Sequence, residues 1–342
     1  MSRFSAGLFF AICWMIVSPV PVWAWGATGH HLINHLAAAS LPAEVPAFMR
    51  TPRATAEITD LGLELDLLKG AGNEWDAAED PGHYVDLLGD GTILGGVRLS
   101  ALPQTREAYD TALRAGGSDQ YKSGYLPYSL VQGWQQLRMT LAYWRVDDYE
   151  SVRATTARLR AISAARRDVD EQLVLRDAGV WGHYVGDACQ PLHVTVHFNG
   201  WGKYPNPNGY SNSTHLHDLF ETVFVDRYVT AAGVATRMTP VRLQASQTLA
   251  NDGAVMSEVE RYLAASDATV PELYRIDKAG GFQNGSPRAL AFVEGRLAFG
   301  ASELRGLIVW AWEDSLNQTI GDDSPQHVRA IVSGNVPYAG LH

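Results

Sequence analysis

Histidine and acidic side chains occur at helical spacing near the middle of the chain. His183 and Asp187 are four residues apart, and so are His217 and Glu221 further on. Since an α-helix repeats about every 3.6 residues, each pair places an imidazole and a carboxylate on one helical face. Zinc binds this mixture of ligands, so the spacing predicts two parts of a metal site.

The residues between these pairs predict where the first helix ends. Pro191 lacks a backbone donor and disfavours helical geometry in the residue before it, so the helix should end near Gln190. His193 then leaves the helix and adds a fifth candidate ligand. One isolated pair is more often a surface salt bridge, whereas two pairs and a further histidine within about forty residues favour a metal site.

The first 24 residues are typical of a signal peptide. They contain a basic start at Arg3, an apolar run from Leu8 to Val17, and a small-residue cleavage site that ends at Ala24. The apolar run is shorter than the about 20 residues that span a membrane, although an uncleaved anchor is the alternative. We therefore predict a periplasmic or extracellular protein without a membrane anchor, whose mature domain covers residues 25–342.

Cleavage after Ala24 would make Trp25 the first residue of the mature chain. A free α-amino group titrates at about 7.7–8.0 and binds metal when neutral. Together with its own carbonyl oxygen it forms a five-membered chelate, and His30 is close enough in sequence to join it. We interpret His31 and His35 as surface or packing residues of the following helix.

Two further segments place candidate side chains around a polar loop. Asp66 is followed one turn later by Lys69, and His83 is followed three residues later by Asp86. These residues are weak evidence by themselves. They fit as ligands because the later helix lacks enough groups to complete a closed site.

Three other residues with metal-binding side chains are interpreted as structural. Cys189 is the one cysteine left after residues 1–24 are removed, so we expect a buried packing residue and no intramolecular disulfide. His197 and His215 lie at or near the ends of a loop over residues 198–213, where we expect hydrogen bonds within the loop. An exported chain without disulfides must rely on its core or on bound metal for stability.

Net charge and apolar spacing limit the partners and the fold. A formal charge of −10 argues against a basic groove for duplex DNA, but bound metal ions would still attract a polyanionic substrate. The spacing of apolar residues predicts a ligand helix from Glu171 to Ala188 and others over 31–41, 105–114, 126–144, 148–165, 217–229, 240–264 and 289–316. We therefore expect an all-α fold with one mostly helical domain, in which the Gly-rich segment 91–124 has room for a small β-hairpin.

Nine of these residues, in their order and types, resemble the superfamily that joins zinc-dependent phospholipase C to the single-strand nucleases of the S-one/P-one and mung bean type. They are Trp25, His30, Asp66, His83, His183, Asp187, His193, His217 and Glu221. The most specific parts are Gly186-Asp187 and Gln190-Pro-Leu-His193, and the similarity covers nearly all of the mature chain. The resemblance implies an all-helical single domain that binds three zinc ions (Zn2+).

The resemblance also implies which residues share an ion. One zinc would be held by Asp66, His83, His183 and Asp187. A second would be held by the Trp25 amino and carbonyl groups, His30 and Asp187, which would bridge the two ions. The third would be held by His193, His217 and Glu221.

The activity implied by this resemblance is phosphodiester hydrolysis. A zinc pair that shares a water lowers the pKa of that water to about 7 or below, and the third zinc neutralises charge on the phosphate. Lys69 matches a basic residue of the nucleases that can contact phosphate. Asp86 would orient the water or, as we prefer, support a ligand.

Three functions are compatible with the sequence, and none of them requires a stable protein partner. A nuclease that cleaves single-stranded DNA or RNA is favoured by Lys69 and by the short gap from Trp25 to His30. Phospholipase C is the alternative, because Glu221 stands where the familiar nucleases have Asp, and residues 124–128 resemble a phospholipase segment. The third is an inactive secreted zinc-binding protein. The chain also departs from the eukaryotic nucleases in lacking their disulfides.

Overall fold

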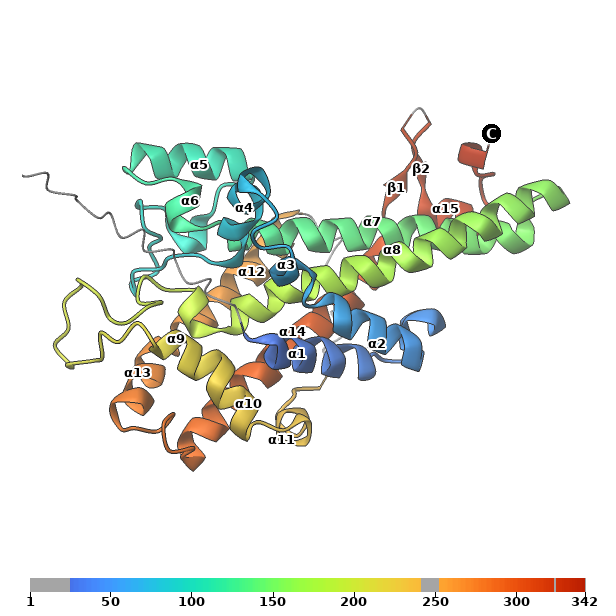
Figure 1. The fold of residues 1–342 in the computed structure, drawn as a ribbon. Helices are drawn as coiled ribbons and strands as arrows, with labels where there is room; N and C mark the ends of the chain where they lie inside the picture. Colours follow the sequence, from blue (N-terminus) through green and yellow to red (C-terminus); the bar gives the residue numbers. More distant parts are fainter. Residues whose placement is uncertain (1–24, 241–251, 323, 342) are drawn as a thin grey trace, which may run out of the picture.

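Helices account for most of the computed structural model, which describes residues 25–240, 252–322 and 324–341 (Figure 1). In chain order they are α1 (Ala27–Ala39), α2 (Pro52–Leu61), α3 (Glu64–Leu67), α4 (Asn73–Glu79), α5 (Arg106–Ala115), α6 (Gln120–Ser123), α7 (Leu126–Arg153), α8 (Ala157–Cys189), α9 (Leu216–Asp218), α10 (Phe224–Tyr228), α11 (Ala231–Ala235), α12 (Asp252–Asp267), α13 (Val270–Lys278), α14 (Pro287–Ser315) and α15 (Val328–Val332). The prediction of an all-α fold is confirmed. The predicted signal peptide lies outside the described residues, as do residues 241–251 of the predicted helix 240–264.

Side-chain caps fix where several helices begin. The hydroxyls of Thr51, Thr156 and Ser286 each accept a hydrogen bond from the backbone N–H three residues later, at 3.0, 3.2 and 3.2 Å. Each bond satisfies one of the free donors at a helix N-terminus. Helix α8 ends at Cys189, two residues before Pro191 and beside the predicted end.

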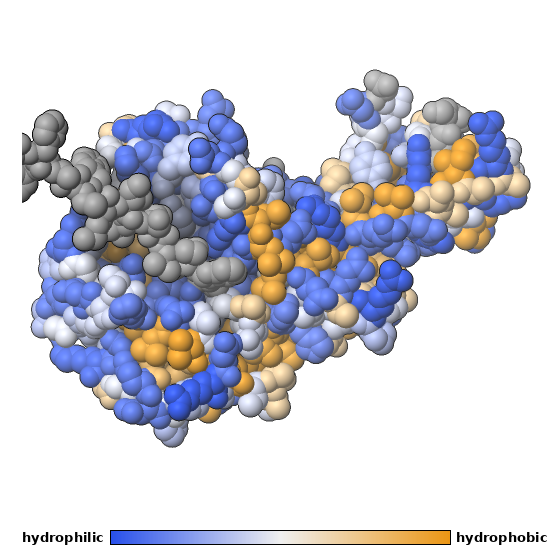
Figure 2. All heavy atoms as spheres, in the orientation of Figure 1, coloured by the Kyte–Doolittle hydropathy of each residue, from blue (hydrophilic) through white to orange (hydrophobic). Residues whose placement is uncertain are grey.

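Helices α7 and α8 form a long antiparallel pair that projects beyond the other helices (Figure 1). The predicted break after residue 144 is wrong, because α7 continues to Arg153 and the turn comes at 154–156, where Thr156 caps α8. The predicted ligand helix is the second half of α8, and its residues are mostly buried from Val174 onward. Figure 2 shows apolar atoms on the projecting part of the pair, where Val152 and Val169 are exposed.

Helix α1 packs against α2, α8 and α14 in the main apolar core. The Asn34 side chain of α1 donates to the carbonyl oxygens of Ile58 in α2 and Gly179 in α8, both at 2.9 Å. Trp310 of α14 is buried with its ring 5.0 Å from that of Trp134, as expected for a core helix. In the described ranges, no helix is long and apolar enough to cross a membrane.

The only strands among the described residues, β1 (Thr319–Ile320) and β2 (Gln326–His327), follow α14. They pair antiparallel and pack, together with α15, against the middle of α7. The small hairpin therefore exists, but the expectation that it lies in segment 91–124 is wrong. There the chain makes only isolated bridges, because closely spaced glycines with positive φ, such as Gly91, Gly95 and Gly96, turn it too tightly for a ladder.

Candidate metal centre

Eight of the nine predicted ligand side chains lie together and buried, in three groups. The groups are His30 with Asp66 and His183, His83 with His183 and Asp187, and His193 with His217 and Glu221. Within each group the ligand atoms lie within 4.8 Å of one another. They come from α1, α3, α8, α9 and three short turns, so the tertiary fold assembles the centre.

Asp187 contacts four histidines from different parts of the chain. Its Oδ2 lies 2.9 Å from Nδ1 of His83 and 3.5 Å from Nε2 of His183. Its Oδ1 lies 3.5 Å from Nε2 of His30 and 3.8 Å from Nδ1 of His193. The carboxylate of Asp187 in α8 therefore contacts the N-terminal segments that carry His30 and His83.

Close packing of α1 on α8 brings His30 to His183. Their rings are stacked, with centroids 3.9 Å apart and an interplanar angle of 10°. Two glycines of α8 allow this approach: a Cβ atom on Gly186 would lie 2.9 Å from Nδ1 of His30, and one on Gly182 would lie 2.3 Å from Oδ1 of Asn34. Side chains at these two positions would separate the helices.

The turn that carries His83 is tied directly to the turn that carries His193. The N–H of Val85 donates to the carbonyl oxygen of His193 at 2.9 Å, and Nδ1 of His193 donates to the carbonyl oxygen of His83 at 2.8 Å. Each residue lies at the end of a short 3-10 turn, Asp80–His83 or Pro191–His193. These reciprocal bonds hold two predicted ligands at a fixed separation.

Backbone carbonyls select the tautomer of three histidines in the centre. Nδ1 of each ring donates to a carbonyl oxygen: Gly62 for His183, His83 for His193, and Phe198 for His217, at 2.8, 2.8 and 3.0 Å. A neutral imidazole has one donor and one acceptor nitrogen, so Nε2 of each ring keeps a lone pair. Such bonds orient metal-binding histidines in proteins.

The pair His217 and Glu221 is not in a regular α-helix as predicted. Residues Leu219–Val223 form a π-helical turn between α9 and α10, a feature that is frequent at functional sites. The pair still faces one way, because Nε2 of His217 lies 2.9 Å from Oε2 of Glu221. Nε2 of His193 lies 3.8 Å from the same oxygen.

Burial shifts the titration of the centre toward neutral side chains. It lowers the pKa of His30, His83 and His193 well below the ordinary value, and that of His183 to about 4. Burial, followed by the charge of Asp66, raises the pKa of Asp187 well above its ordinary range. The rings are therefore neutral near pH 7, which is the form that binds metal.

Several buried ligand atoms in the centre have no hydrogen-bond partner. They include both ring nitrogens of His30, Nε2 of His193, Oδ2 of Asp66 and Oδ1 of Asp187. A buried polar atom without a partner costs about 1–3 kcal/mol. Coordination to a cation would satisfy the acceptor atoms among them, including one nitrogen of His30, so the residues present fit bound metal.

Three further predicted residues lie at different distances from the three ligand groups: Lys69, Asp86 and Trp25. Nζ of Lys69 lies 2.6 Å from Oδ1 of Asp66, so this predicted residue is at the site. Asp86 is buried but outside the three groups, and burial raises its pKa to about 8. Trp25 is fully buried, with its indole N–H donating to Sγ of Cys189 at 3.2 Å and its ring against Phe220. The metal-binding role of its amino group stays a prediction.

The residues interpreted as structural behave accordingly. Cys189 is buried and free, and it belongs to none of the three groups. His197 donates from Nδ1 to the carbonyl oxygen of Trp201 at 2.8 Å, and the two rings stack 3.7 Å apart. His215 is exposed.

One residue at the centre was missed by the sequence reasoning. From the sequence, Gln190 is the expected end of the ligand helix and part of the Gln190-Pro-Leu-His193 segment, but no role is assigned to it, whereas its side-chain amide contacts both His217 and Glu221. A glutamine is a weak metal ligand, so its type gives no signal. Two features point to it: its place directly before Pro191, where the chain turns back, and its presence in the Gln190-Pro-Leu-His193 segment.

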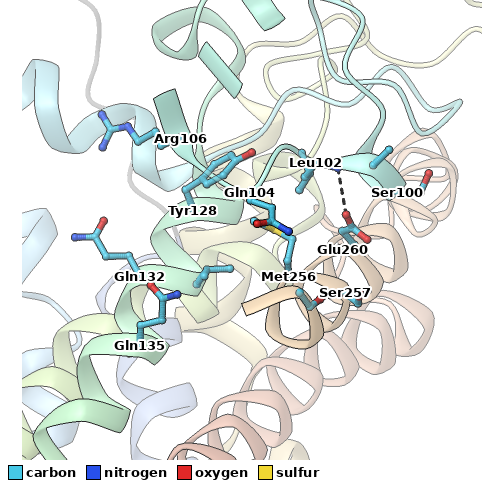
Figure 3. A pocket seen from close by; sticks show the side chains of 13 residues that line it. Ser100, Leu102, Gln104, Arg106, Tyr128, Gln132, Gln135, Met256, Ser257 and Glu260 are labelled. Atoms are coloured by element: carbon cyan, nitrogen blue, oxygen red, sulfur yellow. Dashed lines mark hydrogen bonds between the residues drawn. The ribbon is translucent and has the colours of Figure 1, made fainter. Parts of the chain in front are cut away.

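Two adjoining cavities lie beside the N-terminal half of α7. The larger, of about 450 Å³, is lined by polar and apolar side chains of α7 and α12, among them Gln132, Gln135 and Glu260 (Figure 3). None of the nine predicted ligands lines it. A smaller cavity of about 180 Å³ shares Arg106 and Gln132 with the first and reaches Tyr184, whose ring lies 5.2 Å from that of His83.

The predicted ligand sets agree in part with the observed groups. The set of His193, His217 and Glu221 is the same in both. In the other two groups the shared residue is His183, whereas the resemblance implies Asp187.

Comparison with protein-family models and with curated proteins finds no match for this chain. The superfamily therefore stays a prediction.

Proposed function

We propose that this protein binds three zinc ions at the buried centre and hydrolyses phosphodiester bonds, with single-stranded nucleic acid as its substrate. One observation carries the proposal: eight buried imidazole and carboxylate side chains from distant segments converge in three groups, and several of their ligand atoms have no partner. A centre of this kind serves no evident purpose in packing, since each unpartnered atom destabilises the fold.

The ligand types support zinc over calcium or magnesium. Each group combines imidazole nitrogen with carboxylate oxygen. Calcium and magnesium prefer sites made only of oxygen, whereas zinc accepts nitrogen and oxygen together. Under the proposal, the Trp25 amino and carbonyl groups complete the ligand set beside His30.

Bound zinc would supply Lewis acidity toward phosphate oxygens and would activate water at neutral pH. The protein's own residues position these groups. The carbonyl bonds hold Nε2 of His183, His193 and His217 toward the centre. Lys69 adds a positive charge beside Asp66, where it would attract a phosphate that a chain of net charge −10 otherwise repels.

An exposed aromatic residue whose backbone contacts the third group supports nucleic acid over phospholipid. Phe198 is 41 % exposed, and its carbonyl oxygen accepts the hydrogen bond from His217. Aromatic rings at single-strand binding sites stack on bases, each worth about 1–3 kcal/mol. Phe198 and Lys69 together supply contacts for a base and for a phosphate.

Parallel assays on zinc-loaded mature protein test the proposal. The substrates are single-stranded DNA, RNA and phosphatidylcholine vesicles, each with a chelator-treated control. Release of nucleotides without lipid cleavage is the expected result. Cleavage of lipid alone would replace the nuclease with phospholipase C. No cleavage of any substrate by a protein that retains its zinc would leave a binding protein without activity.

A further inference from the structure

Gln190 is held in one orientation at the end of α8. Its side chain is fully buried, and its Oε1 accepts the N–H of Leu192 at 2.5 Å. Because the amide oxygen is engaged there, the orientation of the NH2 group is determined. The NH2 group faces the group of His193, His217 and Glu221.

The NH2 group donates to two ligand atoms of that group. Nε2 of Gln190 lies 3.0 Å from Nε2 of His217 and 2.9 Å from Oε2 of Glu221. Nδ1 of His217 already donates to the carbonyl oxygen of Phe198, so Nε2 is the acceptor. Gln190 therefore uses the lone pair with which His217 would bind a metal ion.

The two acceptors differ in how many bonds they can accept. An imidazole nitrogen has one lone pair, so His217 cannot accept from Gln190 and ligate a metal at the same time. A carboxylate oxygen has two lone pairs, so Glu221 can do both. Binding of a metal by His217 therefore requires that one of the two Gln190 bonds breaks.

We propose that Gln190 is a positioning residue that holds His217 and Glu221 together until metal binds, and that it lowers the affinity of this group for metal. This inference rests on the proposed binding of metal but not on the substrate. A net hydrogen bond lost on binding lowers the affinity about fivefold.

Gln190→Met tests this inference, because methionine is similar in size and has no N–H donor. The dissociation constant of each zinc is measured by chelator competition on the mature protein, and thermal unfolding is recorded with and without zinc. We expect the metal-free variant to melt below the wild type. We expect one zinc to bind about fivefold more tightly and the others to bind as in the wild type.

Gln136→Met is the matched control. Gln136 of α7 donates to Oδ1 of Asp177 at 2.7 Å, away from the three groups. This variant should melt lower without any change in zinc affinity. An unchanged or weaker third zinc in Gln190→Met would overturn the role of Gln190. A wild type that binds no zinc would instead reject the proposed function.

A measurement on the wild-type chain does not depend on the folding of a variant. The side-chain NH2 protons of Gln190 are followed by NMR while zinc is added. We expect one of the two to lose its hydrogen-bond shift when zinc binds to His217, as the bond to that nitrogen breaks. If both NH2 signals kept their shifts at full zinc occupancy, this would contradict the replacement of the Gln190–His217 hydrogen bond by a zinc–His217 bond.

Discussion

At the scale of single residues, Asp187 is the side chain on which most contacts of the centre depend. Under the proposed function Asp187 is shared by two ions, since its two oxygens face His30 and His83, so we expect Asp187→Asn to reduce bound zinc from three ions to one. Activity should fall by about 100-fold or more. Elemental analysis of the purified variant measures the zinc content.

Asp168→Asn is a suitable control for this change. Asp168 lies on the exposed part of the same helix, where it pairs with Arg167. The variant should keep its zinc and its activity. Full zinc content in Asp187→Asn would show that the carboxylate is not shared between sites.

Sequence reasoning finds residues whose type alone suggests chemistry. Five ligands of the three groups, His183, Asp187, His193, His217 and Glu221, were predicted from side-chain type and spacing. His30, Asp66 and His83 were weak candidates by spacing and were included in the ligand sets through the resemblance. Gln190 was missed because its role depends on which atom its amide faces. That direction follows from the turn at Leu192 and is not encoded in the residue type.

At the scale of elements, the contact between α1 and α8 determines where His30 lies. A Cβ atom on Gly182 would lie 2.3 Å from Oδ1 of Asn34, whose NH2 group is held by bonds to α2 and α8. We therefore expect Gly182→Ala to separate the two helices and to lower the free energy of unfolding by about 1–3 kcal/mol. Denaturant titration measures this loss.

Gly306→Ala is the matched control for the helical glycine. Gly306 is in α14, and a Cβ atom there would have no neighbour within 4 Å. Its stability should be unchanged or higher by up to about 1 kcal/mol, because alanine favours helix. Equal stability of the two variants would show that the close approach at Gly182 does not limit packing.

The α7–α8 pair contains two acids with raised pKa values outside the centre. Burial raises the pKa of Asp147 to about 6, and burial and the charge of Asp147 raise that of Asp170 to about 7. Between about pH 4 and pH 7 the folded state binds more protons than the unfolded state, so stability falls as the pH rises. Asp170→Asn should remove much of this loss.

The expected gain for Asp170→Asn at pH 8 is about 1–2 kcal/mol, after allowance for the partial exposure of the carboxyl. Below pH 4 the variant and the wild type should be equally stable, because both carboxyls are then protonated in either state. Urea titrations at pH 4 and pH 8 measure the difference. A gain of the same size at both pH values would argue against a titrating pair.

Element types were easier to predict than their boundaries. The helices of the core follow from apolar spacing, but the turn between α7 and α8 depends on Thr156 as a cap, and threonine also occurs within helices. The π-helical turn at Glu221 has the same (i, i+4) spacing as an α-helix. Spacing therefore predicted the facing pair and not the backbone that presents it.

At the scale of the whole molecule, we expect the metals to stabilise the fold. The groups join segments from His30 to Glu221, so removal of metal should release the packing of several elements at once. A chelator should lower the melting temperature by about 5 °C or more. Calorimetry with and without chelator measures this, and an unchanged curve would mean that the metals are not structural.

Acid should also lower the stability of the fold, because protons compete with metal ions for the histidine nitrogens. Burial lowers the pKa of His183 to about 4, whereas an unfolded histidine titrates at about 6.5. The unfolded state thus binds more protons between these values, and stability is lost as the pH falls through them. Unfolding in chelator at pH 7 and pH 5 separates this loss from that of the metals.

The bonds from Nδ1 of His183, His193 and His217 to backbone carbonyls have a kinetic consequence. A free imidazole exchanges its hydrogen between two nitrogens, so some of these rings offer a protonated nitrogen to an arriving ion. In this protein the carbonyl bonds fix the tautomer of the three rings when the chain folds, before any ion binds. Loading of these rings should then be limited by dehydration of the ion and by its entry, with no rearrangement of ring hydrogens.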